Sequence, residues 1–301
     1  MGNIDFRECA MRKYLLEFMA ECDYPAKATA DILSAFDKLT SACHDELFAL
    51  VAEYEDSFDI DYIAALDSMR ELSLCADIHE YTGALILFLC YTRALRKYYR
   101  KAGLPDSIFL DSMLDLRYKL DECLCVYGVA GSFVAKWFEG FFKLERFALG
   151  RLQFEIIPFG GEYDLRGVHL MPDSCVLNVH IPRTGERLDH DSVLESYRLA
   201  ADFYRPVLGD KISFVCSSWL LFPRHKEMLK EGSNLRLFID DYEIIASGEY
   251  ANYGEVWRLF DTMYDGNVDN LPADTSLRRA YADLIRNGEK TGWGRGLFIL
   301  E

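Results

Sequence analysis

Several features that mark common protein classes are scarce or missing in this chain of 301 residues. Basic residues are few, because 33 lysines and arginines stand against 49 aspartates and glutamates, which gives a net charge of −16. Proteins that bind nucleic acids usually present a basic surface. An acidic surface keeps a protein soluble and repels polyanions at long range. The composition therefore argues against a nucleic-acid partner.

Long apolar runs and a secretory signal are also missing. The longest apolar stretch, residues 83–91, is too short to cross a bilayer. The first residues, Met-Gly-Asn-Ile-Asp, lack the basic and apolar regions of a signal peptide. We therefore expect a cytoplasmic protein without membrane insertion.

The cysteines lack the regular spacing of a disulfide framework or a zinc site. There are nine, an odd number, and most lie within apolar stretches, which is typical of reduced, buried thiols. Cys43 and His44 are adjacent in an expected helix, so their side chains diverge. The sequence also has no phosphate-loop, zinc-protease, serine-hydrolase or kinase motif. We predict no metal site.

What is present is a large apolar fraction, since hydrophobic residues make up 50% of the chain and aromatic residues 14%. Such a chain folds around a sizeable core. Up to about residue 126, apolar residues recur at helical spacing with little β-branched alternation. This pattern predicts helices over residues 5–21, 23–52 (continuous or kinked near Ala42), 59–74, 76–101 and 106–125. A helical bundle is the natural interpretation.

After Gly128 the pattern changes. One more aromatic helix is expected over residues 132–147, and then the apolar period becomes two, which predicts strands. The expected strands cover residues 151–157, 174–181, 211–221, 235–245 and 297–300, and the expected helices cover residues 191–204, 256–263 and 276–287. We thus predict an α+β protein: an N-terminal helical bundle in residues 1–126, followed by a mixed β-sheet domain with flanking helices in residues 127–301.

The glycine cluster Gly292–Gly296 allows two interpretations. Consecutive backbone N–H groups in a glycine-rich loop can bind phosphate at the start of a helix. Here a helix precedes the cluster and an apolar segment follows it, which favours a tight turn into the last strand.

Alternation along the strands places polar side chains on one face of each strand. If those faces coincide, they form a common polar surface. Its members are Gln153, Glu155, Asn178, His180, one serine of the 211–221 strand and Arg236. This surface is either solvated or packed against the helices, as one face of an antiparallel sheet often is, or it is a catalytic cleft.

In the catalytic interpretation, Glu155 or His180 is a general base that takes a proton from an attacking amine. Asn178, Ser218 or a backbone N–H stabilises the oxyanion of the tetrahedral intermediate. Cys216 is an alternative nucleophile, in a hydrolase that would use His180 as its base, although its apolar strand context favours a packing thiol.

Four stretches of the second half resemble a bacterial family. They are Leu149–Glu155, Leu177–Pro182, Cys216–Leu221 and Ser233–Arg236. Members of that family pair an N-acyltransferase N-terminal helical domain with a GNAT-like C-terminal domain. Two features depart from the resemblance: the usual GNAT phosphate-loop motif is not recognisable, and Ser217 stands where the family pattern has a histidine.

The resemblance implies transfer of an acyl group from acyl-CoA to an amine acceptor by direct attack. It carries over no site residues, so from the faces of the strands we predict Glu155, His180 and Ser218 as catalytic residues. Gln153, Asn178 and Arg236 are predicted to bind the acyl-CoA co-substrate. The alternative from another class is a non-catalytic protein that uses the same scaffold to bind a ligand or a partner.

Overall fold

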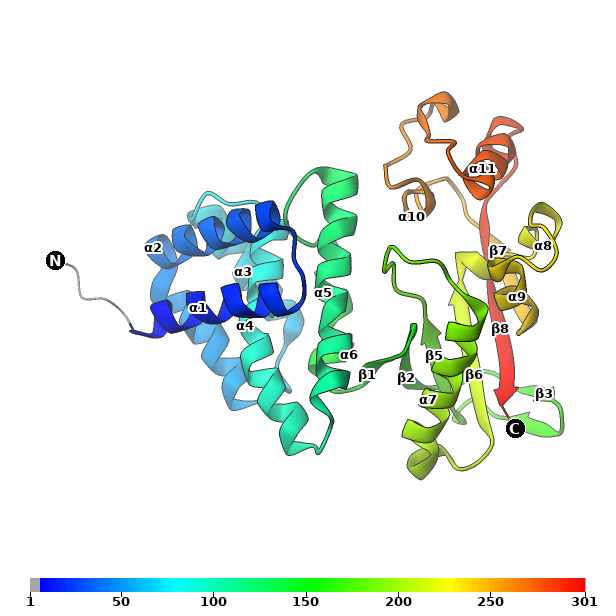
Figure 1. Cartoon of the computed structure of the whole chain (residues 1–301), viewed down its shortest axis with the longest axis horizontal. Helices are drawn as coiled ribbons and strands as arrows, with labels where there is room; N and C mark the ends of the chain where they lie inside the picture. The colour runs from blue at the N-terminus through cyan, green and yellow to red at the C-terminus, as the bar shows by residue number, and fades with distance from the viewer. Residues whose placement is uncertain (1–5, 301) are drawn as a thin grey trace. The chain divides into compact units, whose positions relative to one another are not determined.

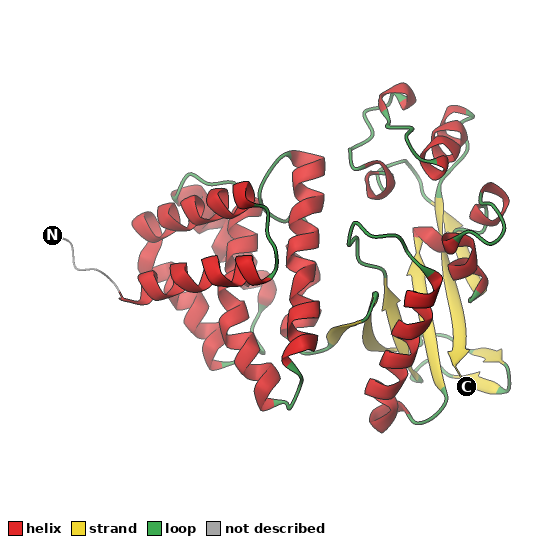
Figure 2. Cartoon of the chain, viewed as in Figure 1, coloured by secondary structure: helices red, strands yellow, loops and turns green. Residues whose placement is uncertain are grey.

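The computed structural model describes residues 6–300, which form two compact units. The first unit comprises Met1–Phe147 and is helical, and the second comprises Ala148–Glu301 and contains a six-stranded sheet (Figures 1 and 2). Within residues 6–300 no helix combines the length and the apolar character needed to cross a bilayer. The predicted α+β class, with helices first and a mixed sheet second, is confirmed.

The first unit is built from amphipathic helices joined by short turns. They are α1 (Phe6–Glu21), α2 (Ala26–Asp56), α3 (Tyr62–Cys75), α4 (Glu80–Lys101) and α5 (Asp106–Tyr127), followed by the 3₁₀ turn η1 (Ala135–Phe138) and α6 (Glu139–Phe142). All five helices predicted before residue 126 are present. The Asp61 carboxylate caps α3 by accepting from the backbone N–H groups of Ile63 and Ala64.

Helix α2 is kinked, as the sequence allowed. Cys43 has non-helical dihedral angles (φ −142°, ψ 45°) in the middle of the helix. Its side chain is buried, and its thiol lies 4.0 Å from the Leu72 carbonyl oxygen of α3. The kink thus occurs where α2 packs on α3.

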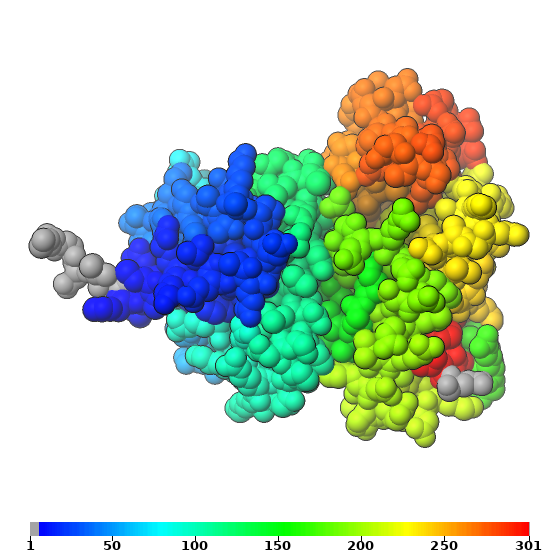
Figure 3. Space-filling model, in the orientation of Figure 1, coloured from blue at the N-terminus to red at the C-terminus, as the bar shows by residue number. Residues whose placement is uncertain are grey.

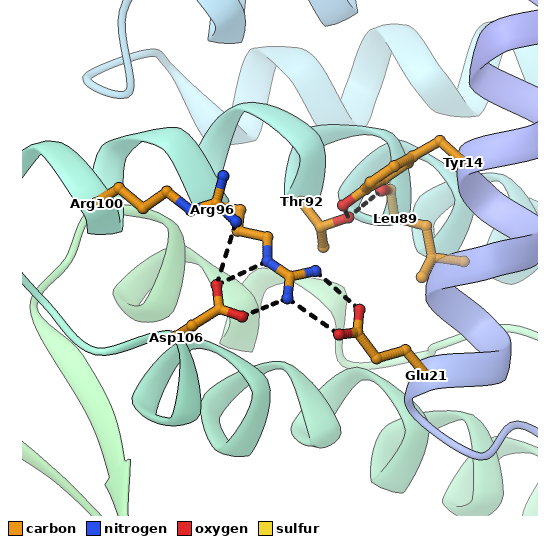
Figure 4. Close-up of polar contacts among 7 residues, drawn as sticks. All are labelled: Tyr14, Glu21, Leu89, Thr92, Arg96, Arg100 and Asp106. Carbon is orange, nitrogen blue, oxygen red and sulfur yellow. Dashed lines mark hydrogen bonds and ion pairs between the residues drawn. The ribbon is translucent and has the colours of Figure 1, made fainter.

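A group of ion pairs centred on Arg96, here named the Arg96 cluster, connects α4 to α1 and α5 (Figure 4). The guanidinium donates to the Glu21 carboxylate of α1 at 2.8 and 3.0 Å, and through Nε to the Asp106 carboxylate of α5 at 2.8 Å. A second guanidinium nitrogen also bonds Asp106. Nearby, the Tyr14 and Thr92 hydroxyls lie 3.0 Å apart. Bidentate contacts of this kind fix orientation as well as supply attraction.

The end of the first unit differs from the prediction. The boundary expected after residue 126 lies instead between Phe147 and Ala148, within strand β1 (Arg146–Leu149). The segment packs with the helices because its aromatic side chains complete their core: Phe88 of α4 meets the rings of Phe138 and Phe142 at 5.1 and 4.8 Å. The continuous helix expected over residues 132–147 is also wrong. It is replaced by η1, α6 and a turn at Leu144, where φ is +55°.

The second unit is a mixed sheet with helices on one face and at one end. Its strands are β2 (Leu152–Pro158), β5 (Cys175–His180), β6 (Ile212–Ser218), β7 (Glu243–Glu249) and β8 (Gly292–Leu300), and the sheet order is β1-β2-β5-β6-β8-β7. A separate hairpin consists of β3 (Tyr163–Leu165) and β4 (Val168–Leu170). The other elements are α7 (His190–Leu208), η2 (Trp219–Leu221), α8 (His225–Met228), α9 (Asn234–Asp240), α10 (Trp257–Phe260), η3 (Val268–Asn270) and α11 (Ser276–Arg286).

Two different layers cover the sheet. On one face, Tyr197 of α7 packs on Phe214 and Phe298, and Tyr204 donates to the Phe154 carbonyl. On the other face, the β3–β4 hairpin and Phe159 cover Val176, Val215 and Leu297. Residues from about 250 to 285, orange in Figures 1 and 3, gather as a cap at one end of the sheet. The hairpin was not predicted, because its strands are only three residues long.

Two strand predictions need correction. Residues 235–245 are not one strand, because α9 occupies Asn234–Asp240 and β7 begins only at Glu243. The helix is favoured by the ion pair between Arg236 and Asp240, four residues apart, at 2.9 Å. The cluster Gly292–Gly296 is neither a phosphate loop nor a turn, since it forms the first half of β8.

The glycines of β8 make room for close packing against the strand. A Cβ atom at Gly294 would lie 2.1 Å from the Leu221 carbonyl oxygen, and one at Gly296 would lie 2.6 Å from the Tyr242 Cβ. Both distances are far below contact. Gly294 is therefore required by the contact of β8 with η2, and Gly296 by its contact with Tyr242, which follows α9.

Candidate functional site

Three of the predicted site residues meet on one face of the sheet. β2 and β5 are antiparallel, with Glu155 paired to Asn178 and Gln153 to His180. His180 Nε2 lies 2.7 Å from Glu155 Oε1, and Asn178 Nδ2 donates to the same carboxylate oxygen at 3.0 Å. The Glu155 and His180 side chains are 15% and 20% exposed, so water still reaches them. We name Glu155, Asn178 and His180 the polar cluster.

The chemistry of the carboxylate fixes how these groups bond. An ionised carboxylate only accepts hydrogen bonds, so His180 must carry its proton on Nε2 to bond Glu155. Asn178 Nδ2 also lies 3.1 Å from His180 Nε2, but two donors cannot bond each other, and both point to Glu155. Glu155 thus fixes the orientation of the imidazole through the bond to Nε2.

Beside the polar cluster, the pairing between the two central strands stops. β5 and β6 are parallel neighbours, yet only Leu177 with Phe214 and Asn178 with Val215 pair. Val179 and His180 continue β5, and Cys216 to Ser218 continue β6, without pairing to each other. The pairing of β5 with β6 therefore ends beside the polar cluster, at residues 179–180 of β5 and 216–218 of β6. We name this region the splay.

The loop after β5 leads from the splay into α7. It covers residues 181–189, and the Asp189 carboxylate caps α7 by accepting from the Ser192 N–H at 3.2 Å. Arg151 donates to the Pro182 carbonyl at 3.0 Å, and Arg183 pairs with Asp261 at 2.7 Å. These contacts hold the loop at its start and at its end. Between them, Arg187 is exposed.

The other predicted residues lie in different surroundings. Gln153 is on the same face as the polar cluster but is only 1% exposed. Ser218 is the last residue of β6 and caps η2, accepting from the Leu220 N–H at 3.1 Å. Arg236 lies on α9 and bonds Asp240 and the Lys226 carbonyl, so it is not on the polar face of the strands. The structure brings together Glu155, Asn178 and His180 and leaves Ser218 and Arg236 elsewhere.

Two further residues share the polar face, and neither was among the predicted catalytic or co-substrate-binding residues. Ser217 follows Val215 by two positions, so it points to the side of Asn178, and it is exposed. It pairs in register with Arg295 of β8, whose guanidinium bonds the Phe159 carbonyl and lies 5.0 Å from that ring. The sequence did not indicate Arg295 as a site residue, because the glycine cluster around it was interpreted as a turn or a loop and not as a strand.

Cys216 is an unreactive thiol. Its side chain is fully buried, and burial raises the pKa of the thiol to about 12. A thiolate nucleophile needs the opposite surroundings, with cations and partial exposure. Within residues 6–300, no group of three or more His, Cys, Asp or Glu side chains could hold a metal ion.

Comparison with protein families identifies both units. Residues 13–144 match the N-acyltransferase N-terminal domain, and residues 147–298 match the GNAT-like C-terminal domain. The chain belongs to this family. The match to the GNAT-like domain begins at residue 147, one residue before the second compact unit begins at Ala148. A search of curated proteins found no match.

Solved structures of similar fold are acyltransferases. One, determined in complex with decanoyl-CoA and teicoplanin, is 20% identical, has a TM-score of 0.71 and aligns over 95% of this chain and 87% of its own. Another, in complex with CoA and 10C-teicoplanin, is 20% identical with a TM-score of 0.72 and the same coverage. A third, with decanoyl-CoA, is 19% identical with a TM-score of 0.70 and the same coverage. At 19–20% identity, this likeness shows the fold of the chain and does not by itself show its activity.

Proposed function

We propose that this protein transfers an acyl group from an acyl-CoA thioester to an amine. The observation that carries the proposal is the position of the polar cluster directly beside the splay between β5 and β6. Family membership and the acyl-CoA complexes of the similar structures support the same reaction class. Fold alone does not establish activity, so the residues of the site must supply the chemistry.

The splay suits the pantetheine arm of coenzyme A. That arm carries amide groups, which can pair with the unpaired backbone groups of β5 and β6 as an added strand would. At the end of β5 the chain enters α7, where Asp189 already accepts from the Ser192 N–H, so the phosphates would use the other N–H groups of the first turn. Arg187, exposed on the connecting loop, would add a positive charge for the phosphates.

In the reaction, the nitrogen of the acceptor amine attacks the thioester carbonyl carbon, and the C–N bond forms. The imidazole of His180, which Glu155 orients, accepts the amine proton. The C–S bond then breaks, and the leaving thiolate of CoA takes up a proton. Backbone N–H groups in the splay would stabilise the oxyanion of the intermediate. Atoms balance as acyl-CoA plus amine giving amide plus CoA.

Binding and turnover can be tested separately. The melting temperature of the purified protein should rise with CoA and with acyl-CoAs in a dose-dependent manner, because a ligand that binds only the folded state stabilises it. Release of CoA thiol in the presence of an amine panel then measures turnover. Binding without turnover across the panel would favour the non-catalytic alternative, and no binding of CoA or any thioester would refute the proposal.

The base is tested with Glu155→Gln and His180→Gln. Each should lower kcat by about 10²- to 10⁴-fold, the usual contribution of general-base catalysis, while CoA still binds. His169→Gln is the matched control, because His169 forms a comparable pair with Asp164, at 2.9 Å, on the exposed hairpin. Equal losses in all three variants, or unchanged kcat in the first two, would exclude His180 as the base.

A further inference from the structure

Arg295 of β8 is a half-buried cation without an acidic partner. Its guanidinium donates to the Phe159 carbonyl oxygen and lies 5.0 Å from the centre of the Phe159 ring. Among residues 6–300, no carboxylate lies at ion-pair distance from this guanidinium. Other arginines of the second unit do have such a partner, as Arg183 has in Asp261. Arg295 therefore carries a charge that no described side chain neutralises.

The chemistry of this group points to an anionic ligand. Acidic residues outnumber basic ones by 49 to 33, so partners are plentiful, and charged groups withdrawn from water are normally paired. A guanidinium has five N–H donors in a planar fork that matches a carboxylate. Phe159 accepts from one nitrogen and supports the cation with its ring. The other donors reach solvent, and they can bind a carboxylate at two points.

Arg295 points to the same side of the sheet as the polar cluster. It pairs in register with Ser217 of β6. The last pair between β5 and β6 is Asn178 with Val215. Two residues further along these strands come His180 on β5 and Ser217 on β6, and residues two apart on a strand share a face. His180, Ser217 and Arg295 thus lie on one face of three successive strands, with the splay between the first two.

Packing on both sides of β8 agrees with this assignment. Leu297, two residues after Arg295, packs with Val215 on the face that the hairpin and Phe159 cover. Gly294, the residue before Arg295, meets Leu221 of η2 instead. Between the splay and Arg295, the only side chain in register is that of Ser217, which is small and exposed. No bulky group on β6 therefore separates the polar cluster from Arg295.

The order of these groups relates Arg295 to the acyl chain of the donor. In the proposed reaction the thioester lies in the splay, between His180 and Ser217. The acceptor amine lies beside His180, because that imidazole takes its proton. The acyl chain is another substituent of the thioester carbon, and it can extend over Ser217. Neighbouring strands are about 4.8 Å apart, so the end of a short chain then comes within reach of the Arg295 guanidinium.

We propose that Arg295 binds a carboxylate at the end of the acyl group, so that the donor is the CoA monothioester of a short dicarboxylic acid. The inference rests on the proposed acyl-CoA function and names the class of acyl group. Arg295 is a specificity-determining residue in this assignment and takes no part in proton transfer. A chain with a net charge of −16 otherwise repels a further negative charge, so a preference for an anionic acyl group requires a local cation.

Calorimetric titration of the purified protein with matched pairs of thioesters tests the inference. The pairs have equal numbers of acyl carbons: malonyl- and propanoyl-CoA, succinyl- and butanoyl-CoA, glutaryl- and pentanoyl-CoA. In at least one pair the dicarboxylic thioester should bind about tenfold or more tightly than its partner, the equivalent of a hydrogen bond to a charged group. This gain should shrink with added salt, since the interaction is between charges at a half-buried site.

Variants of the arginine assign the gain to its charge and shape. Arg295→Met keeps an apolar stem and should abolish the gain while the affinity for CoA stays unchanged. Arg295→Lys keeps the charge without the planar fork and should keep only part of the gain. Arg198→Met is the matched control, because it removes the same charge from a 67% exposed side chain on α7, and it should keep the gain in full. Melting temperatures verify that each variant is folded.

The possible failures are distinguishable. If CoA binds but no dicarboxylic thioester is favoured by the wild type, or if the gain survives in Arg295→Met, the inference is wrong and the proposed function still stands. If the thioester pairs are equal and Arg295→Met instead loses turnover only with amines that carry a carboxylate, Arg295 binds the acceptor, which also overturns the assignment. If CoA itself does not bind the wild type, the proposed function fails and this inference fails with it.

Discussion

The Asp261 carboxylate lies 2.7 Å from the guanidinium of Arg183, which joins the loop after β5 to the turn after α10. The same carboxylate pairs with Arg278 of α11 at 2.6 Å. Asp261 has a left-handed backbone conformation, with φ +59°, which is uncommon outside Gly, Asn and Asp. A residue that can adopt this conformation and carry a charge therefore connects the loop of residues 181–189 to α11.

Asp261→Asn should lower both stability and ligand affinity. Asparagine tolerates the left-handed conformation, so the substitution removes the charge without straining the backbone. We expect the free energy of unfolding to fall by about 1–3 kcal/mol, the range for hydrogen bonds to charged groups, and Kd for CoA to rise. Urea unfolding and calorimetry measure the two effects. Asp269→Asn is the control, because its partner Arg286 is exposed and the change should be small.

The Arg96 cluster should make stability depend on pH at the acid end. The hydrogen bond from Arg96 holds the pKa of Asp106 below its usual value. A carboxyl with a lowered folded-state pKa stabilises the protein fully above its unfolded pKa, about 4. That contribution is lost as pH falls through the lower folded value. The loss of unfolding free energy in Asp106→Asn should thus be constant near neutrality and shrink below about pH 4.

The magnitude at neutral pH should be about 1 kcal/mol or less, because the Asp106 side chain is 42% exposed and water screens the pair. Urea unfolding at a series of pH values measures it. Asp31→Asn, at an exposed position of α2, should change little at any pH. A difference between wild type and Asp106→Asn that grows in acid would contradict the assignment.

Gly294→Ala should be strongly destabilising. The added Cβ would meet the Leu221 carbonyl oxygen at 2.1 Å; β8 is held by pairing with β6 and β7, and η2 follows directly on β6. We expect a loss of about 1–3 kcal/mol or more in thermal or urea unfolding. At Gly161, where the nearest atom would be 3.7 Å away, the same substitution should cost little. Equal effects at the two positions would mean that chain entropy, and not close packing, requires the glycine.

Cys216→Ala should keep acyl transfer. The thiol is buried on the α7 face of the strand, and its raised pKa leaves almost no thiolate at neutral pH. The free energy of unfolding should fall by about 1–2 kcal/mol from the small cavity that is left. Turnover with any active amine measures the catalytic effect, and a loss of more than tenfold in a folded variant would restore the thiol as nucleophile.

The sequence predicted the polar cluster because alternation within a strand is a local property. Gln153 and Glu155 share a face of β2, and Asn178 and His180 share one of β5, whatever the neighbouring strands do. That the two faces coincide depends on register, which the sequence alone does not specify but which the structure provides by pairing Glu155 with Asn178. The broad order of helices and then a mixed sheet followed from periodicity in the same way.

The prediction failed in short segments, where the same pattern of apolar residues is compatible with both a helix and a strand. Leu235, Leu237 and Ile239 alternate as in a strand, yet the seven residues of α9 form a helix that buries Phe238 and Ile239. Arg236 was placed on the polar face for that reason. The segment from Ser132 to Phe147 reads as one aromatic helix, but it breaks into short turns so that Phe138 and Phe142 reach the helical core. Such choices are decided by tertiary packing.

The interruption between β5 and β6 also gives the sheet a seam. Among residues 6–300, only two backbone pairs join β5 to β6, and the contacts between the two halves of the sheet otherwise come from side chains, from α7 and from the β3–β4 hairpin. Amide hydrogens beside the seam should exchange with solvent faster than those of the fully paired ladders on either side. A ligand that bridges the two strands would close this seam. It would then be a structural member of the sheet as well as a reactant, and departure of the product would return the sheet to two halves.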